Sequence, residues 1–222
     1  GDRNQTRINR NVSQMDGSNV SFVPYNIAPQ SIVFTAPLAQ GFATDSILVG
    51  PEVFTGISGF YDFKSNGETN EYIQVDALNP LNIHVIDVQS DSLDQAGATT
   101  RRTKYSFSTD GGLTWELSVD VPNVRSGFGV LQLKDGAAVI SNHSTNAGNR
   151  LDANLYIDVA PLAATFNEYS HPNPSTRPFG IWPQISVYNN GNVGLISRRN
   201  VSSTVPPETL YYSVYTGGTQ MS

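Results

Sequence analysis

The sequence contains no cysteine, so disulfide bonds, thiol chemistry and thiolate metal sites are excluded. Charged residues make up only 14%, and the formal net charge is −6, which argues against nucleic acid and anionic membranes as partners. No apolar run approaches the ~20 residues of a membrane-spanning helix. No segment carries a sustained apolar stripe with the period of a helix. These absences predict a chain with little helix and no insertion into a membrane.

The clearest pattern that is present is a hairpin in residues 105–117. Residues 105–109 alternate large side chains or Thr with Ser, as a β-strand does, and Asp110-Gly111-Gly112 supplies a tight turn. Residues 113–117 are then expected to form the return strand. The spacing resembles an Asp box, the BNR hairpin motif of sialidase-type β-propellers, and the residues that carry it are Ser108, Asp110, Gly112, Thr114 and Trp115.

The hairpin repeats along the chain. Residues 156–166 align without a gap with residues 105–115, an offset of 51 residues, and residues 211–218 form a third copy. Pro161 stands where the first copy has Asp110, so the second turn is expected to lose its carboxylate. The unit is typical of a four-stranded β-propeller blade. A β-sandwich would explain the turns but not the gapless alignment.

The predicted fold class is therefore all-β, a β-propeller of four-stranded antiparallel blades. Residues 1–20 are polar without periodicity, which predicts a flexible N-terminal arm. Residues 21–222 are expected to form the propeller segment, with blade-like repeats at about 71–120, 121–170 and 178–222. The chain is expected to supply three to four blades, an incomplete set of a larger propeller, because an open ring exposes strand edges. The third repeat is expected to stop before its return strand.

Five longer runs accompany the Asp box: Gly59–Gly67, Asn79–His84, Ala138–His143, Leu155–Pro161 and Ile181–Gln184. Together they resemble the large proteins that gliding and related Gram-negative bacteria export by type IX secretion. The resemblance covers about residues 55–218. It implies an extracellular or outer-surface location. The C-terminal sorting domain of that family is not visible in this sequence, and the molecular function of the family's propeller is undefined.

Sialidase-like glycoside hydrolases are the enzyme class that an Asp box suggests. Their chemistry uses three arginines on a carboxylate, a tyrosine nucleophile backed by a glutamate, and an acidic proton donor. The adjacent pairs at 101–102 and 198–199 each offer at most one arginine to a common pocket, because strand neighbours face opposite sides. No complete set is evident, so catalysis is not favoured. The candidate ligand-contacting residues are Arg150, Arg177, Trp182 and His143.

No cofactor is predicted. The histidines lack the paired spacing of a zinc site. Asp87, Asp91 and Asp94 do not follow the pattern of a calcium loop, so a calcium ion there has no motif to support it.

The function that these patterns favour is an exported, non-catalytic propeller module that binds a glycan or a protein at the cell surface. Two alternatives stay open, a sialidase-like hydrolase and a structural subunit of an extracellular assembly. The expected partners include the remaining blades, from the same polypeptide or from another chain.

Overall fold

A computed structural model describes residues 54–59, 71–94, 99–145, 151–172, 179–199 and 209–222. The chain divides into two compact units, Gly1–Gly50 and Pro51–Ser222, and every described residue belongs to the second unit. The predicted N-terminal arm at 1–20 lies outside the described residues.

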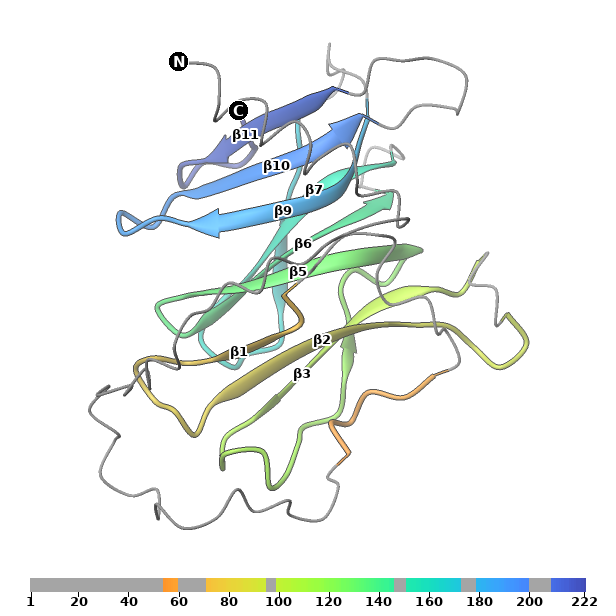
Figure 1. Ribbon diagram of the computed structural model, residues 1–222, viewed down its shortest axis with the longest axis vertical. Coiled ribbons are helices and arrows are strands. Elements are labelled where there is room, and N and C mark those ends of the chain that lie inside the picture. The colour runs from red at the N-terminus through yellow and green to blue at the C-terminus, as the bar shows by residue number, and fades with distance from the viewer. Residues whose placement is uncertain (1–53, 60–70, 95–98, 146–150, 173–178, 200–208) are drawn as a thin grey trace, which may run out of the picture. The chain divides into compact units, whose positions relative to one another are not determined.

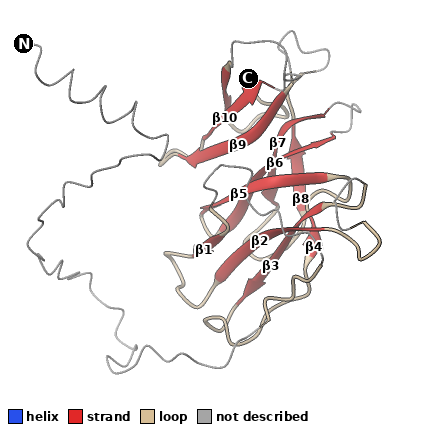
Figure 2. Ribbon diagram, turned by 45° about the vertical axis from the view of Figure 1, so that its right-hand side comes forward, coloured by secondary structure: helices blue, strands red, loops and turns tan. Residues whose placement is uncertain are grey.

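Every regular element in the described part of the chain is a β-strand (Figure 2). No helix in this part is long and apolar enough to cross a membrane. The strands are β1 (Ile73–Val75), β2 (Ile83–Gln89), β3 (Arg102–Ser108), β4 (Val119–Asp120), β5 (Ser126–Lys134), β6 (Ala137–Thr145), β7 (Leu151–Asp158), β8 (Phe166–Tyr169), β9 (Gly180–Val187), β10 (Val193–Arg199) and β11 (Leu210–Tyr215).

The strands form three antiparallel sheets in which each strand pairs with its neighbour in the sequence. The sheet orders are β1-β2-β3-β4, β5-β6-β7-β8 and β9-β10-β11. The short turns explain this topology: Gly136 has a φ of 79° and Gly191 a φ of 79°, and glycine reaches such values without strain. Figure 1 shows the sheets stacked in chain order.

The sheets pack face to face through apolar residues that alternate along the strands. On β6, Ile140 faces the first sheet and packs with Ile86 and Tyr105, whereas Val139 faces the third sheet and packs with Leu195. Adjacent strand residues point to opposite faces, so a central strand is apolar on both sides. Each fully buried aliphatic side chain contributes roughly 1.5–3 kcal/mol.

Stacked four-stranded antiparallel sheets of this kind are the blades of a β-propeller. The all-β propeller prediction is therefore confirmed, and the described residues form blade 1 (β1–β4), blade 2 (β5–β8) and blade 3 (β9–β11). Tyr105 and Tyr156, which the repeat aligned, occupy matching places: each is buried on the third strand of its blade, opposite Ile86 and Ile140 respectively.

Two local expectations were wrong. The return strand of the first hairpin does not begin within 113–117 but at Val119–Asp120, because residues 108–115 form the turn. The second turn does not lack a carboxylate: Asp158 accepts hydrogen bonds from the backbone N–H groups of Ala164 and Thr165, each at 3.0 Å. The expectation that the third repeat stops before its return strand is confirmed: within the described residues blade 3 has three strands and none follows β11, and Ser222 and Val214 exchange two backbone hydrogen bonds.

Candidate functional site

The turn between β3 and β4 is held by its own side chains. Asp110 Oδ1 accepts hydrogen bonds from Ser108 Oγ at 2.8 Å and from the Thr114 N–H at 2.9 Å, and Oδ2 accepts one from Thr114 Oγ1 at 2.6 Å. Trp115 Nε1 donates to the Gly112 carbonyl at 3.1 Å. The hydrogen bonds from Thr114 and Ser108 lower the pKa of Asp110 to about 2. The carboxylate is therefore occupied by the turn that contains it.

A second group of side chains gathers where β5 and β9 begin. We call it the Phe128 cluster, and its members are Arg101, Phe128, His143, Trp182 and Arg198. The Arg101 guanidinium lies 4.8 Å from the centre of the Phe128 ring, and the His143 ring centre is 5.1 Å from it. Trp182 packs against the buried pair Val88 and Phe128, and the Arg198 guanidinium lies 5.0 Å from the centre of the Trp182 ring.

Two equivalent β-bulges aim the aromatic rings of the cluster. The pairing of β5 with β6 shifts between Gly127 and Val130, and the pairing of β9 with β10 shifts between Ile196 and Arg198. Phe128 and Trp182 sit in these irregular stretches with φ values of 52° and 50°. A bulge turns a side chain away from the direction that strict alternation would give it. The same device therefore recurs in two successive blades.

His143 is neutral in the folded protein. It is almost fully buried, and burial, followed by the nearby charges of Arg101 and Arg125, lowers its pKa to about 3. Its Nε2 lies 3.3 Å from Arg101 Nη2, while Nδ1 has no hydrogen-bond partner among the described residues. A buried neutral imidazole between cations suits a packing role better than proton transfer at neutral pH.

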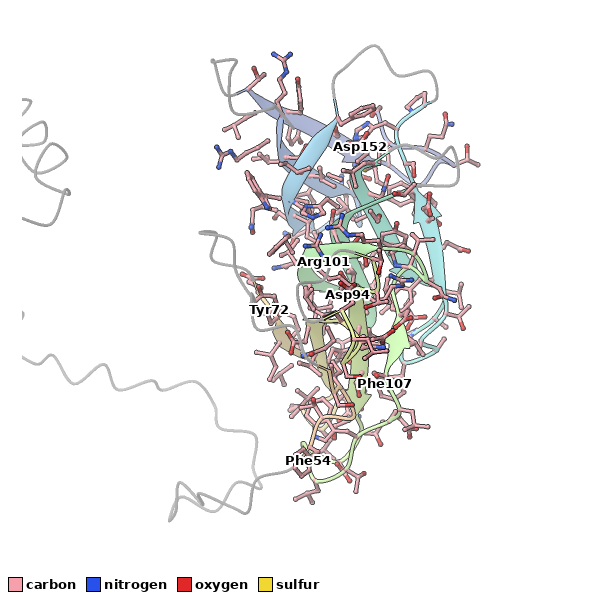
Figure 3. All side chains as sticks on the ribbon, turned by 90° about the vertical axis from the view of Figure 1, so that its right-hand side faces the viewer. Phe54, Tyr72, Asp94, Arg101, Phe107 and Asp152 are labelled. Atoms are coloured by element: carbon pink, nitrogen blue, oxygen red, sulfur yellow. The ribbon has the colours of Figure 1, made fainter. Side chains whose placement is uncertain are left out.

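The residues that precede or open the third strands also tie neighbouring blades together. Arg101 Nε donates to the Ser126 carbonyl at 2.9 Å, where β5 begins. Asp152 Oδ1 accepts the Gly180 N–H at 2.7 Å, where β9 begins. Figure 3 labels Arg101 and Asp152, which are 51 positions apart in the repeat. Each blade therefore fixes the start of the next.

The candidate ligand residues are placed as follows. Trp182 and His143 come together around Phe128, between blades, whereas Arg150 and Arg177 lie outside the described residues. Arg101 was not among the candidates, although strand alternation indicated that at most one arginine of its pair would face a common pocket. Which of the two does so depends on the stacking of the blades, and no local signal in the sequence reports it.

A cavity of about 680 Å³ opens on the other face of blade 1. Its wall includes Gln89, Arg102 and Lys104, which alternate on β2 and β3 with residues that face blade 2. Gly59 closes one side so tightly that an added Cβ would lie 2.6 Å from the Gln89 side chain. Further lining residues are Ser58, Ser90, Asp91, Ser92, Asp120 and Asn123. The cavity is therefore lined mainly by hydroxyl, amide and charged groups.

Asp87 on β2 and Asp94 in the following loop accept hydrogen bonds from the protein. Asp94 Oδ2 accepts the backbone N–H groups of Thr99 at 2.7 Å and of Thr100 at 2.6 Å. Asp87 Oδ2 accepts Gln89 Nε2 at 2.8 Å. Within the described ranges, no three acidic or histidine side chains group as metal ligands would.

No protein-family model matches the sequence, and no curated protein matches it. Among solved structures, a thermostable family-43 glycoside hydrolase is similar at 12% identity with a TM-score of 0.43, covering 71% of this chain and 51% of that chain. The NanB sialidase from Streptococcus pneumoniae is similar at 17% identity with a TM-score of 0.35, covering 56% of this chain and 19% of that chain. This chain thus spans about half the length of the first protein and less of the second.

Proposed function

We propose that this chain is part of an exported, non-catalytic β-propeller module that binds a glycan, and that the cavity on blade 1 holds the sugar. The observation that carries the proposal is the cavity itself, whose volume of about 680 Å³ lies within the range of about 300–1,000 Å³ for small-ligand sites. Strands β2 and β3 form its floor, so its polar groups are held on rigid backbone.

The chemistry of the wall suits a sugar. Hydroxyl groups both donate and accept hydrogen bonds, and amides offer both kinds of group, so each sugar hydroxyl can find a partner. Gln89 Nε2 is bound to Asp87, while Gln89 Oε1 and Ser90 Oγ are buried and have no hydrogen-bond partner among the described residues. These two atoms lie beneath the surface, so the groups of the wall that a ligand reaches are exposed ones such as those of Ser92 and Asn123.

The non-catalytic part of the proposal rests on the carboxylates. Glycoside hydrolysis generally needs two carboxyl groups that flank the scissile bond. Asp120 Oδ1 lies 2.7 Å from Lys104 Nζ in an ion pair. Asp91 is then the one acidic residue of the described wall that forms no ion pair. One such carboxylate is fewer than the two that glycoside hydrolysis needs.

The exported location rests on the sequence. The resemblance of residues 55–218 to type IX secreted proteins supports it, as does a composition poor in charge and rich in Asn, Ser and Thr. Antibody labelling of intact cells of the source organism would test it, and signal only after lysis would contradict it.

Further blades are proposed to cover the outer face of blade 3. Ile196, Leu210 and Tyr212 share that face and are 46%, 68% and 61% exposed. Apolar side chains in such a group favour contact with another apolar surface. A continuing blade of the same polypeptide would match the way that blades 1 to 3 already pack on one another.

The glycan proposal is tested with two matched tryptophan variants. Asn123 is exposed and lines the cavity, whereas its neighbour Val124 is 39% exposed and does not. The parent protein and both variants are screened against an array of neutral and acidic glycans. We expect Asn123→Trp to lose binding by obstructing the cavity and Val124→Trp to keep it. Equal binding by both variants, or no binding by the folded parent, would refute the proposed site.

A further inference from the structure

The side chain of Arg102 is fixed at the cavity wall. Its Nη1 donates to two backbone carbonyls, that of Thr99 at 3.1 Å and that of Arg101 at 3.0 Å. These bonds orient the guanidinium plane from one end. Nε is buried and has no acceptor among the described residues. An arginine has five N–H donors, and Nη2 donates no hydrogen bond among the described residues, so its N–H groups remain for a further partner at the cavity wall.

Among the described residues, the charged side chains near Arg102 do not form an ion pair with it. Lys104 and Asp120 are bound to each other at 2.7 Å, and Asp87 accepts hydrogen bonds from the Gln89 side chain and the Val88 backbone. Asp91 is exposed, so water screens its charge, whereas Arg102 is only partly exposed. Within the described part of the wall, Arg102 forms no ion pair. A partly buried cation without a counter-charge favours an anion brought by the ligand.

We propose that Arg102 makes this cavity selective for a sugar that carries a carboxylate, such as a uronic acid. The inference rests on the glycan site proposed above and specifies its ligand. The Nη2 group of a guanidinium can donate to a carboxylate oxygen, and such charge-assisted hydrogen bonds are among the strongest available. Gln89, Ser90 and Ser92 surround the same space with the groups that ring hydroxyls require.

The test compares an acidic oligosaccharide with its neutral counterpart. Tetragalacturonic acid and its full methyl ester differ in charge at each carboxyl group but share the ring hydroxyls. Both are titrated calorimetrically into the parent protein and into the variants Arg102→Gln, Arg102→Lys and Arg199→Gln. Arg199 lies on β10, away from the cavity wall. The variant Arg199→Gln has the same net charge as Arg102→Gln but leaves the wall unchanged, so it serves as the control. Circular dichroism checks that each variant is folded.

We expect the parent and Arg199→Gln to bind the acid at least about tenfold more tightly than the ester, since a hydrogen-bonded charge pair is worth about that factor. Arg102→Gln should abolish the preference, and Arg102→Lys should restore only part of it, because a lysine has no planar fork. If the parent binds the acid and the ester equally and Asn123→Trp binds neither, the carboxylate preference is overturned while the glycan site stands. Failure of every glycan on the array to bind would overturn the site itself.

Discussion

The repeated tyrosines of blades 1 and 2 allow a sharp comparison of two buried hydrogen bonds. Tyr105 Oη lies 2.7 Å from His84 Nδ1, and both side chains are fully buried. His84 Nε2 has no partner among the described residues. Tyr105→Phe keeps the ring and its edge-on contact with Phe166 at 5.2 Å but removes the hydroxyl. Both nitrogens of His84 would then be buried without a partner.

The matching substitution in blade 2, Tyr156→Phe, should lower the free energy of unfolding by less than Tyr105→Phe does. Tyr156 Oη lies 2.6 Å from Ser144 Oγ, and Ser144 Oγ also accepts Asn154 Nδ2 at 3.0 Å. After Tyr156→Phe the serine keeps that second bond. Removing one partner of a buried polar group costs about 1–3 kcal/mol, whereas losing a bond between groups that stay satisfied costs about 0.5–1.5 kcal/mol. We therefore expect Tyr105→Phe to reduce the free energy of unfolding by about 1–3 kcal/mol and Tyr156→Phe by about half as much.

Urea unfolding followed by circular dichroism measures both variants. In a domain of this size, each kcal/mol also lowers Tm by about 2–4 °C. The double variant His84→Leu/Tyr105→Phe should recover part of the loss, because replacing both polar partners removes the unpaired group. The reasoning is refuted if Tyr156→Phe costs as much as Tyr105→Phe, or if the double variant is no more stable than Tyr105→Phe alone.

Two further predictions concern acid stability and the outer face of blade 3. Folding lowers the pKa of His143 to about 3. As the pH falls below ~6.5, this histidine therefore takes up a proton in the unfolded chain but not in the folded protein. The free energy of unfolding should then decrease by up to about 1.4 kcal/mol for each unit by which the pH is lowered. Urea titrations between pH 7.5 and 5.5 should show a smaller slope for His143→Gln, and an unchanged slope would contradict this account. The double variant Leu210→Ser/Tyr212→Ser should self-associate less in sedimentation velocity than the parent. The control Val159→Ser alters an exposed turn residue elsewhere, and an equal effect there would argue against a specific apolar face.

The repeat predicted the blades better than it predicted their turns. Gapless alignment placed Tyr156 on Tyr105, and both lie at the same point of their sheets. The alignment also put Pro161 in place of Asp110, yet Asp158 supplies a carboxylate to the second turn from a different position. A turn needs acceptors for its N–H groups, and more than one backbone path can bring them there. An alignment by position therefore misses a carboxylate that fulfils the same role from a different place in the sequence.

The candidate site was only partly accessible from the sequence. His143 and Trp182 were candidates, and the structure brings both to Phe128. The cavity wall around Arg102 combines residues from strands and loops that the sequence does not show to be adjacent. Nothing in the pattern of residues 101–102 says which arginine faces the neighbouring blade.

Alternation and turn chemistry are local, and they alone determined that this chain is all-β, that its strands pair with their sequence neighbours, and that the unit repeats. A side chain's face within a strand follows from the two-residue period. The residues that each face contacts do not follow from this period. Arg101 reaches His143 across 42 positions, and Arg102, the next residue, turns to a cavity. Only the stacking of blades decides this, because the contacts between sheets join residues that have no local relation in the chain.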